Sequence, residues 1–212
     1  MFDIELDVDI LRRNRELADE NRRILDEHDI VAVDVMGSVA AGKTSLIVQL
    51  TRLLKGKHRI AAFAGDTTTT IDAELIEEAG ADVLEINTGK ECHLDANLVR
   101  KALQSIDLDQ FDVLLIENVG NIICPADFPL GSHKRLVVIS LTDGPYVVMK
   151  HPFVFQDAEV AVINKVDLAQ ATGISPDKLE TQLLEVKPSL KVVRMNSLTG
   201  EGAARLASAL DL

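Results

Sequence analysis

The sequence is poor in aromatic residues and has no excess of positive charge. With no Trp, one Tyr and six Phe, it lacks most of the side chains that stack on single-stranded bases. Its formal net charge of −12 repels phosphate backbones and anionic lipid surfaces. We therefore expect no nucleic acid and no membrane among its partners, and an acidic surface suited to solubility and to handling cations.

Long apolar runs and cysteines are also scarce. No apolar segment approaches the roughly 20 residues that span a bilayer. Met1 is followed by acidic residues rather than by a basic stretch and an apolar run, so we expect a cytoplasmic protein. The two cysteines, Cys92 and Cys124, are compatible with a disulfide, with a catalytic or metal-binding pair, and with two buried apolar side chains. Their number alone does not choose among these.

Short apolar segments rich in β-branched residues alternate with helical segments along most of the chain. This pattern predicts an α/β fold, a mostly parallel sheet with helices on both faces. We predict strands at 30–36, 59–64, 82–86, 111–116, 136–140, 159–163 and 190–194, and helices at 44–54, 70–79 and 94–106. The apolar content of 47% suffices for one sizeable core, so we predict a single domain over 29–212.

Residues 1–28 show a different pattern. Ile10, Leu17 and Ile24 recur every two helical turns among many charged residues, which indicates an amphipathic helix with a solvated face. We predict that 1–28 is an amino-terminal helical arm that packs either on its own domain or on a partner.

A phosphate-binding motif follows the first predicted strand, where ligands bind in parallel sheets. The run GSVAAGKT lies between a predicted strand and a predicted helix, as in the P-loop NTPase fold. Its glycines let backbone N–H groups point at a phosphate, and the helix adds the positive end of its dipole. We predict that Lys43 reaches the terminal phosphates and that the Thr44 hydroxyl binds Mg²⁺. The predicted phosphate contacts are Gly37, Ser38, Val39, Ala40, Ala41, Gly42, Lys43, Thr44 and Ser45.

A second motif, Asn164-Lys165-Val166-Asp167, follows a predicted strand farther along the chain. The carboxylate of Asp167 can accept two hydrogen bonds from the N1–H and the exocyclic amine of guanine, a pattern that adenine does not offer. We predict that Asn164 ties this turn to the phosphate loop and that the stem of Lys165 covers one face of the base. After the last strand, the backbone N–H groups of Ser197 and Leu198 are candidates for binding the guanine oxygen.

Two acidic residues at predicted strand ends are candidates for catalysis and for the magnesium site. Asp66 follows the strand 59–64, and Glu117 follows the strand 111–116. With Thr44 they would hold Mg²⁺, and with Lys43 they form the predicted catalytic set, in which a carboxylate orients the attacking water. For Asp66, an N-cap of the following helix is an equally good interpretation.

A soft donor set is divided between two further strand ends. Cys92 and His93 follow the third predicted strand, and Cys124 follows the fourth. Two thiolates and an imidazole suit Ni²⁺ or Zn²⁺ better than Mg²⁺. Three protein ligands leave a coordination position for water or a symmetric partner. Each cysteine by itself is equally compatible with a core position, and His58, His133 and His151 are further candidates.

In combination these motifs resemble the HypB family of hydrogenase nickel-incorporation GTPases, over nearly the whole chain. The residues that carry the resemblance are Gly65-Asp66-Thr67, the stretch from Gly89 to Asp95, the stretch from Glu117 to Pro125, and Asn164 to Asp167. The resemblance implies a GTPase fold of the signal-recognition (SIMIBI) class, slow hydrolysis of GTP to GDP and phosphate, and a nucleotide-promoted homodimer. It also implies a metal bound at the subunit boundary by Cys92, His93 and Cys124. Nickel would pass to the hydrogenase large subunit with the help of a second accessory protein.

The sequence departs from the family pattern in two ways. Residues 1–30 contain no Cys and only His28, so the tight amino-terminal nickel store of some members is not expected. The phosphate loop lacks the extra lysine near its start that several related GTPases have, so a lysine from elsewhere would have to substitute.

Three other functions fit parts of the sequence. A urease-type nickel GTPase would share the fold but usually carries a Cys-Pro-His motif, which this sequence lacks. A P-loop nucleotide kinase would transfer phosphate to a small acceptor with no preference for guanine. A non-enzymatic scaffold with a structural zinc would unfold when Cys92 is replaced.

Overall fold

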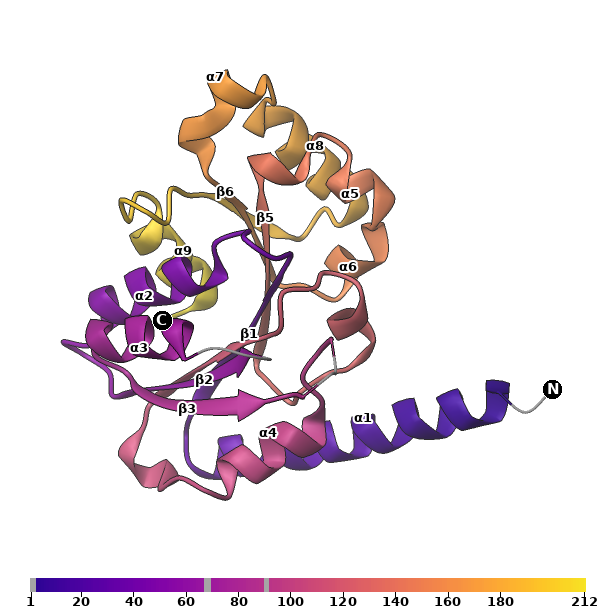
Figure 1. Cartoon of the computed structure of the whole chain (residues 1–212), viewed down its shortest axis with the longest axis vertical. Helices are drawn as coiled ribbons and strands as arrows, with labels where there is room; N and C mark the ends of the chain where they lie inside the picture. Colours follow the sequence, from indigo (N-terminus) through magenta and orange to yellow (C-terminus); the bar gives the residue numbers. More distant parts are fainter. Residues whose placement is uncertain (1–2, 67–69, 90–91) are drawn as a thin grey trace.

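The computed structural model describes residues 3–66, 70–89 and 92–212, and the side chains of residues 3–8 and of Asp66 lie outside the described part. At its centre is a seven-stranded parallel sheet (Figure 1). The strands are β1 (Val31–Gly37), β2 (Ile60–Asp66), β3 (Asp82–Asn87), β4 (Val113–Glu117), β5 (Lys134–Ser140), β6 (Val160–Asn164) and β7 (Lys191–Arg194). The predicted parallel α/β sheet is therefore confirmed.

β1 lies in the middle of the sheet, whose strand order is β3-β2-β4-β1-β5-β6-β7. Val33 and Val35 of β1 belong to the apolar core on one face, and Ala32 and Met36 belong to clusters on the other. A strand buried on both faces has no solvent side, which explains the nearly unbroken apolar runs in the sequence. Because the strands are parallel, the segments that follow them emerge at the same edge of the sheet.

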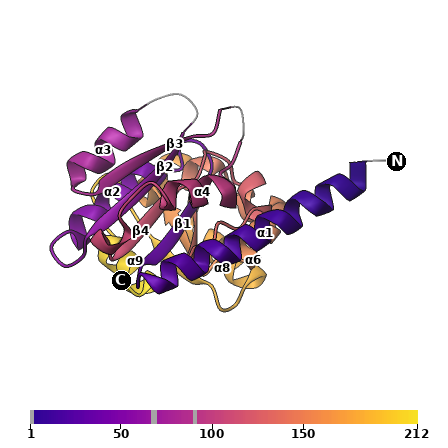
Figure 2. The same cartoon turned by 90° about the horizontal axis from the view of Figure 1, so that it is seen from below.

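Helices cover both faces (Figures 1 and 2). On one face, α2 (Lys43–Leu54), α3 (Ile71–Ala79) and α9 (Ala203–Leu210) bury apolar side chains against the sheet. On the other face, α1 (Asp3–Glu27) and α4 (Ala96–Leu103) share a core with β2 and β4. Beside them, α5 (Val147–Lys150), α6 (Pro152–Gln156) and α8 (Pro176–Val186) pack on β5 and β6. The shorter elements are α7 (Ala169–Thr172) and the 3-10 helices η1 (Leu108–Gln110), η2 (Cys124–Asp127), η3 (Leu141–Asp143) and η4 (Val166–Leu168).

The amino-terminal helix α1 packs on its own domain. Figure 2 shows it running along α4, with its first turns extending beyond the body of the molecule. The side chain of Asn14 accepts a hydrogen bond from the backbone of Ala96 (2.8 Å) and donates to that of Pro129 (2.9 Å). The side-chain amide of Asn21 donates to the backbone oxygens of Ala96 (2.8 Å) and Leu130 (3.0 Å). These bonds fix the helix to α4 and to the loop before β5.

The predicted amphipathic face of α1 is confirmed except at its start. Ala18 and Leu25, next to the predicted Leu17 and Ile24, are buried together with Asn14 and Asn21, whereas Ile10, which we expected on the apolar face, is 50% exposed. The spacing of four, three and four residues places these four on one side of the helix. Two of them are polar, and they are tolerated because their side chains bond backbone groups of the domain.

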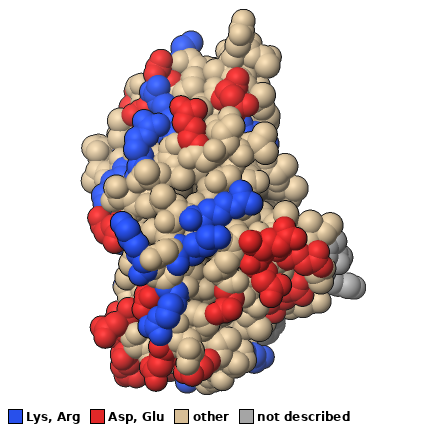
Figure 3. Space-filling model, turned by 90° about the vertical axis from the view of Figure 1, so that its left-hand side faces the viewer, with Lys and Arg blue, Asp and Glu red and all other residues tan. Residues whose placement is uncertain are grey.

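Charged residues of both signs share the surface. On the face formed by α2, α3 and α9, Lys and Arg make a broken row with acidic groups on either side (Figure 3). In the part of the chain that the structure describes, no helix is both long enough and apolar enough to cross a membrane.

Candidate functional site

The phosphate loop connects the end of β1 at Gly37 to the start of α2 at Lys43. Ala40 and Gly42 adopt positive φ angles of 60° and 98°, and the N–H of Ala41 donates to the oxygen of Ser38 (3.2 Å). The Ser38 hydroxyl donates to Oδ1 of Asp143 (2.9 Å) in η3, which anchors the loop to the segment after β5. The loop is therefore curled and held from outside, as a phosphate cradle requires.

Gly42 is required at its position for two reasons. Its φ of 98° is a backbone conformation that residues with a Cβ rarely adopt. A Cβ there would also lie 2.3 Å from Nδ2 of Asn164 and 3.1 Å from Oγ of Ser197. The phosphate loop and the Asn-Lys-Val-Asp turn are thus packed directly against each other.

The predicted link between the two nucleotide motifs is confirmed. Nδ2 of the buried Asn164 donates to the oxygen of Ala41 (2.8 Å) and to Oγ of Ser197 (2.8 Å). Nζ of Lys165 donates to the oxygen of Ala40 (2.7 Å). One asparagine thereby joins the loops that follow β1, β6 and β7.

A cavity of about 750 Å³ lies over these loops, a size typical of small-molecule sites. It is lined by predicted nucleotide-site residues, namely Val39, Ala40, Gly42, Lys43, Thr44, Ser45, Glu117, Lys165, Asp167, Ser197 and Leu198. It is also lined by residues that we had not assigned to the nucleotide site: Gly65, Asp72, Leu75, Asn118, Val119, Gly120, Leu168 and Asn196. Four of these, Gly65 and residues 118–120, lie in the stretches that carry the family resemblance. Four predicted contacts, Gly37, Ser38, Ala41 and Asn164, do not line it. The glycine-lysine loop and the Asn-Lys-Val-Asp turn face the same cavity.

The loop after β7 is already engaged within the protein. The N–H of Ser197 donates to Oδ1 of Asn164 (3.0 Å), and the N–H of Leu198 donates to Oδ1 of Asn196 (3.1 Å). A guanine oxygen would have to share or displace these acceptors. The side chain of Leu198 is 84% exposed at the rim of the cavity.

Two of the three groups predicted for magnesium, those of Thr44 and Glu117, meet at the phosphate loop. The Thr44 hydroxyl donates to Oε1 of Glu117 (2.8 Å), and Glu117 is only 5% exposed at the end of β4. A hydroxyl and a carboxylate beside a phosphate cradle are hard oxygen donors that fit Mg²⁺. Asp66 ends β2, next to β4 in the sheet, but its side chain lies outside the described residues, as does Thr67.

The predicted nickel or zinc ligands come from two loops that lie side by side. Sγ of Cys92 is 3.7 Å from Nδ1 of His93. The His93 ring packs on Phe128, with 4.0 Å between the ring centroids, and Phe128 directly follows η2, which begins at Cys124. Neither cysteine is in a disulfide. Among the described residues, no group of three or more His, Cys, Asp or Glu side chains is assembled to hold a metal.

One further candidate histidine is bonded elsewhere in the protein. His133, which the sequence offered as a candidate ligand, accepts a hydrogen bond from the N–H of Ala32 (3.0 Å) at Nδ1. Its Nε2 is 2.8 Å from Oδ1 of Asp26 in α1. This imidazole therefore ties the amino-terminal helix to β1.

Sequence reasoning missed a buried polar group beneath the cavity. Asp34 in β1 is fully buried, with Asn118 and Arg135 beside it. Burial raises the pKa of the Asp34 carboxyl above its usual value, while Arg135 and the hydrogen bond from Asn118 oppose the shift. The sequence does contain a signal for this group that we did not use, a lone acidic residue inside the apolar run 31–37.

The central strand of a parallel sheet leads through a glycine-lysine loop into a helix, under a cavity that Asp167 also lines, and Asn164 bonds this loop from the neighbouring turn. This arrangement defines a nucleotide-binding protein of the P-loop NTPase class. Residues 31–194 match the family model described as CobW/HypB/UreG, nucleotide-binding domain. The chain belongs to the HypB family of hydrogenase maturation factors, as comparisons over 94% of its length show.

Two solved structures and one curated relative illustrate this. The chain is 50% identical over 199 residues to the probable hydrogenase maturation factor HypB of Methanocaldococcus jannaschii, covering 94% of this chain and 90% of that protein. The crystal structure of HypB from Archaeoglobus fulgidus superimposes with a TM-score of 0.88 at 40% identity, covering 94% of this chain and 98% of that one. HypB from Helicobacter pylori, crystallised in complex with nickel, gives a TM-score of 0.87 at 26% identity over 93% of each chain.

Proposed function

We propose that this protein hydrolyses GTP and uses the nucleotide cycle to deliver nickel during maturation of nickel-iron hydrogenase. The observation that carries the proposal is the single cavity lined by both Lys43 and Asp167. It brings the predicted phosphate-binding and guanine-selecting groups to one edge of the sheet, to which the loop between β3 and α4, with Cys92, also leads. The HypB of Helicobacter pylori crystallised with nickel supports the choice of cargo.

GTP lies in the cavity with its phosphates on residues 37–45 and its base against Asp167 and Lys165. Thr44, Asp66 and Glu117 would hold a magnesium ion, which would supply positive charge that neutralises the outer phosphates. In the hydrolysis step, a carboxylate of Asp66 or Glu117 orients a water molecule, whose oxygen bonds to the γ-phosphorus while its proton passes to that carboxylate or to an oxygen of the γ-phosphate. The bond from the γ-phosphorus to the bridging oxygen breaks, the electron pair stays on the GDP oxygen, and Lys43 stabilises the charge that builds up on the phosphates. The products are GDP and phosphate.

Nickel, or zinc in its place, binds to Cys92, His93 and Cys124. The soft sulfur and nitrogen donors, with Sγ of Cys92 3.7 Å from Nδ1 of His93, support this assignment. We also propose a homodimer that forms with GTP. The metal passes to the hydrogenase large subunit with the help of a second nickel accessory protein. We place this process in the cytoplasm, where thiols stay reduced and able to bind a metal.

Guanine selection by Asp167 tests the nucleotide part of the proposal. Replacing Asp167→Ala removes two hydrogen bonds to a charged acceptor, each worth about 1.5–3 kcal/mol. We expect the full-length variant to lose its preference for GTP over ATP by at least about tenfold, measured as the ratio of kcat/KM values for hydrolysis. The matched control is Glu201→Ala, an exposed acidic residue of the neighbouring loop that does not line the cavity. It should keep the preference.

The same assay separates this function from a nucleotide kinase. A wild-type protein that uses ATP and GTP equally and passes phosphate to a small acceptor would contradict the proposal. The urease-type alternative is disfavoured because the curated relative at 50% identity is a probable hydrogenase maturation factor. The scaffold alternative is tested by Cys92→Ala, which we expect to lose metal and keep its fold because Cys92 is exposed.

A further inference from the structure

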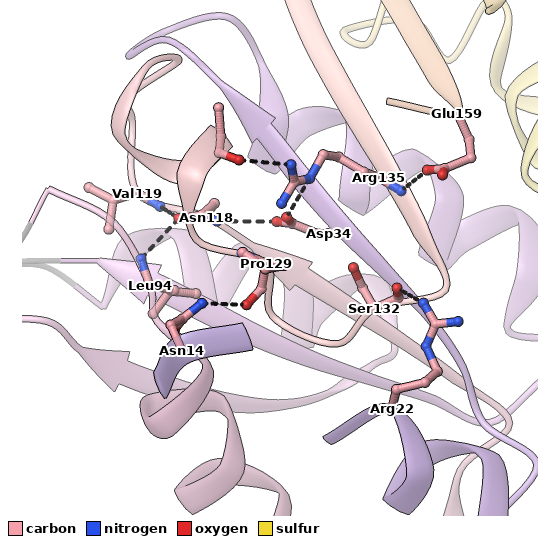
Figure 4. A network of polar contacts seen from close by, with 11 residues as sticks. Asn14, Arg22, Asp34, Leu94, Asn118, Val119, Pro129, Ser132, Arg135 and Glu159 are labelled. Atoms are coloured by element: carbon pink, nitrogen blue, oxygen red, sulfur yellow. Dashed lines mark hydrogen bonds and ion pairs between the residues drawn. The ribbon is translucent and has the colours of Figure 1, made fainter. Parts of the chain in front are cut away.

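Three buried polar side chains, those of Asn118, Asp34 and Arg135, form a connected line that starts at the backbone of Leu94 (Figure 4). Oδ1 of Asn118 accepts hydrogen bonds from two backbone groups, the N–H of Leu94 (3.1 Å) and the N–H of Val119 (3.0 Å). Leu94 directly follows His93, and both Asn118 and Val119 line the nucleotide cavity. One side-chain oxygen therefore connects the wall of the cavity to the metal-binding loop.

The line continues through β1 to the other metal-binding segment. Nδ2 of Asn118 donates to Oδ1 of Asp34 (3.2 Å), and Nε of Arg135 lies 3.6 Å from Oδ2 of Asp34. Nη1 of Arg135 donates to the backbone oxygen of Ala126 (3.1 Å), two residues after Cys124. Figure 4 shows these side chains pointing toward one another from the segments around β1, β4 and β5.

Stability alone is a poor reason for this arrangement. Asp34 is 0%, Asn118 1% and Arg135 9% exposed, and the neighbouring positions of β1 on this face, Ala32 and Met36, are apolar. Apolar side chains would fill the same space at less desolvation cost, since a buried ion pair rarely contributes net stability. What the polar groups provide is directionality, because hydrogen bonds fix where the two loop backbones lie.

We propose that Asn118, Asp34 and Arg135 are positioning residues that hold the Cys92–His93 loop and the Cys124 segment in place for the metal and connect them to the nucleotide cavity. The coupling part of this proposal rests on the proposed function. Nucleotide contacts at 118–120 shift Asn118, and Leu94 follows because it bonds the same oxygen as Val119. Residues that hydrogen-bond a metal-binding loop fix the orientation of its ligands in this way without contacting the metal themselves.

Asn118→Ala in the full chain tests the proposal. The variant frees the N–H groups of Leu94 and Val119, so amide hydrogen exchange of the protein without metal or nucleotide should become faster in residues 92–96 and 119–126. In a Ni²⁺ titration we expect affinity to fall about 10- to 100-fold. The ratio of Ni²⁺ affinities measured with GDP and with a non-hydrolysable GTP analogue should move toward one.

Asn21→Ala is the matched control, because Asn21 is also a buried asparagine that bonds two backbone groups, but from α1. We expect it to lower stability and leave the exchange of 119–126 and the Ni²⁺ affinity as in the wild type. If Asn118→Ala does not fold, Arg135→Lys serves instead, since it replaces the two separate nitrogens with which Arg135 contacts Asp34 and Ala126 by a single one. It should speed exchange at 124–126 and weaken Ni²⁺ binding.

The proposal would be overturned if Asn118→Ala lowered stability but left both the amide exchange of residues 92–96 and the Ni²⁺ affinity as in the wild type. Equal Ni²⁺ affinity of the wild-type protein in both nucleotide states would instead refute the proposed function. The exchange comparison needs neither metal nor nucleotide, so it still confirms or refutes the anchoring role by itself.

Discussion

At the scale of single residues, the site depends on side chains that bond backbone atoms of distant loops. Asn164 bonds the oxygen of Ala41, 123 residues away in the sequence, and orders the N–H of Ser197 as well. Asn118 likewise accepts hydrogen bonds from the N–H groups of Leu94, in a distant loop, and of its neighbour Val119. A side-chain amide suits this task because it offers donors and an acceptor on one planar group.

Gly42→Ala tests how tightly the two nucleotide motifs are packed. A Cβ at this position forces a strained φ and displaces Nδ2 of Asn164. We expect a loss of about 1–3 kcal/mol in the free energy of unfolding, measured by urea denaturation, and weaker binding of a fluorescent GTP analogue. At Gly56 a Cβ would meet no atom within 4 Å, so Gly56→Ala should keep nucleotide affinity. Unchanged stability and affinity in Gly42→Ala would contradict the geometry described here.

Residues with a contiguous motif were predictable from the sequence, and residues without one were not. Lys43, Thr44 and Asp167 belong to short motifs, so their position in the cavity was expected. Asp34 and Asn118 act as a pair separated by 84 residues, and no local pattern indicates such a partner. The engagement of the Ser197 and Leu198 N–H groups was missed for the same reason, because their acceptors depend on how the loop folds.

At the scale of elements, the strands of the sheet and the helices between β1 and β4 follow from the periodicity of apolar residues. The short helices α5 and α6 between β5 and β6 were not predicted, because four- and five-residue helices are too short to show a period. The face of α1 was assigned wrongly at Ile10, because the helix docks through Asn14 and Asn21 as well as through apolar side chains. Polar contacts of this kind leave no hydrophobic pattern.

Leu25→Ala tests the docking of α1. Leu25 is fully buried in the core shared with Ile30 and Leu130, so its truncation should cost about 2–5 kcal/mol in the free energy of unfolding. Ile10→Ala, on the same helix but 50% exposed, should change it by less than about 0.5 kcal/mol. Urea denaturation of both variants gives the comparison. Equal, small effects would mean that the helix is not part of the cooperative unit.

At the scale of the whole molecule, the parallel sheet brings the nucleotide cavity and the predicted metal ligands to one edge. The segments that follow β1, β6 and β7 line the cavity, and those that follow β3 and β4 carry Cys92, His93 and Cys124, which we propose as ligands. Glu117 and Asn118 at the end of β4 lie between them and contact both. A ligand at one site can therefore alter the other through a single loop.

The most direct test of this account is a Ni²⁺ titration of the full chain with GDP and with a non-hydrolysable GTP analogue, with the particle mass measured in each state. We predict that the two Ni²⁺ affinities differ by at least about fivefold. The chain should be a dimer with the analogue, and Cys92→Ala should remove the tight binding while the protein stays folded. Equal affinities in both states, unaffected by Cys92→Ala, would contradict the account.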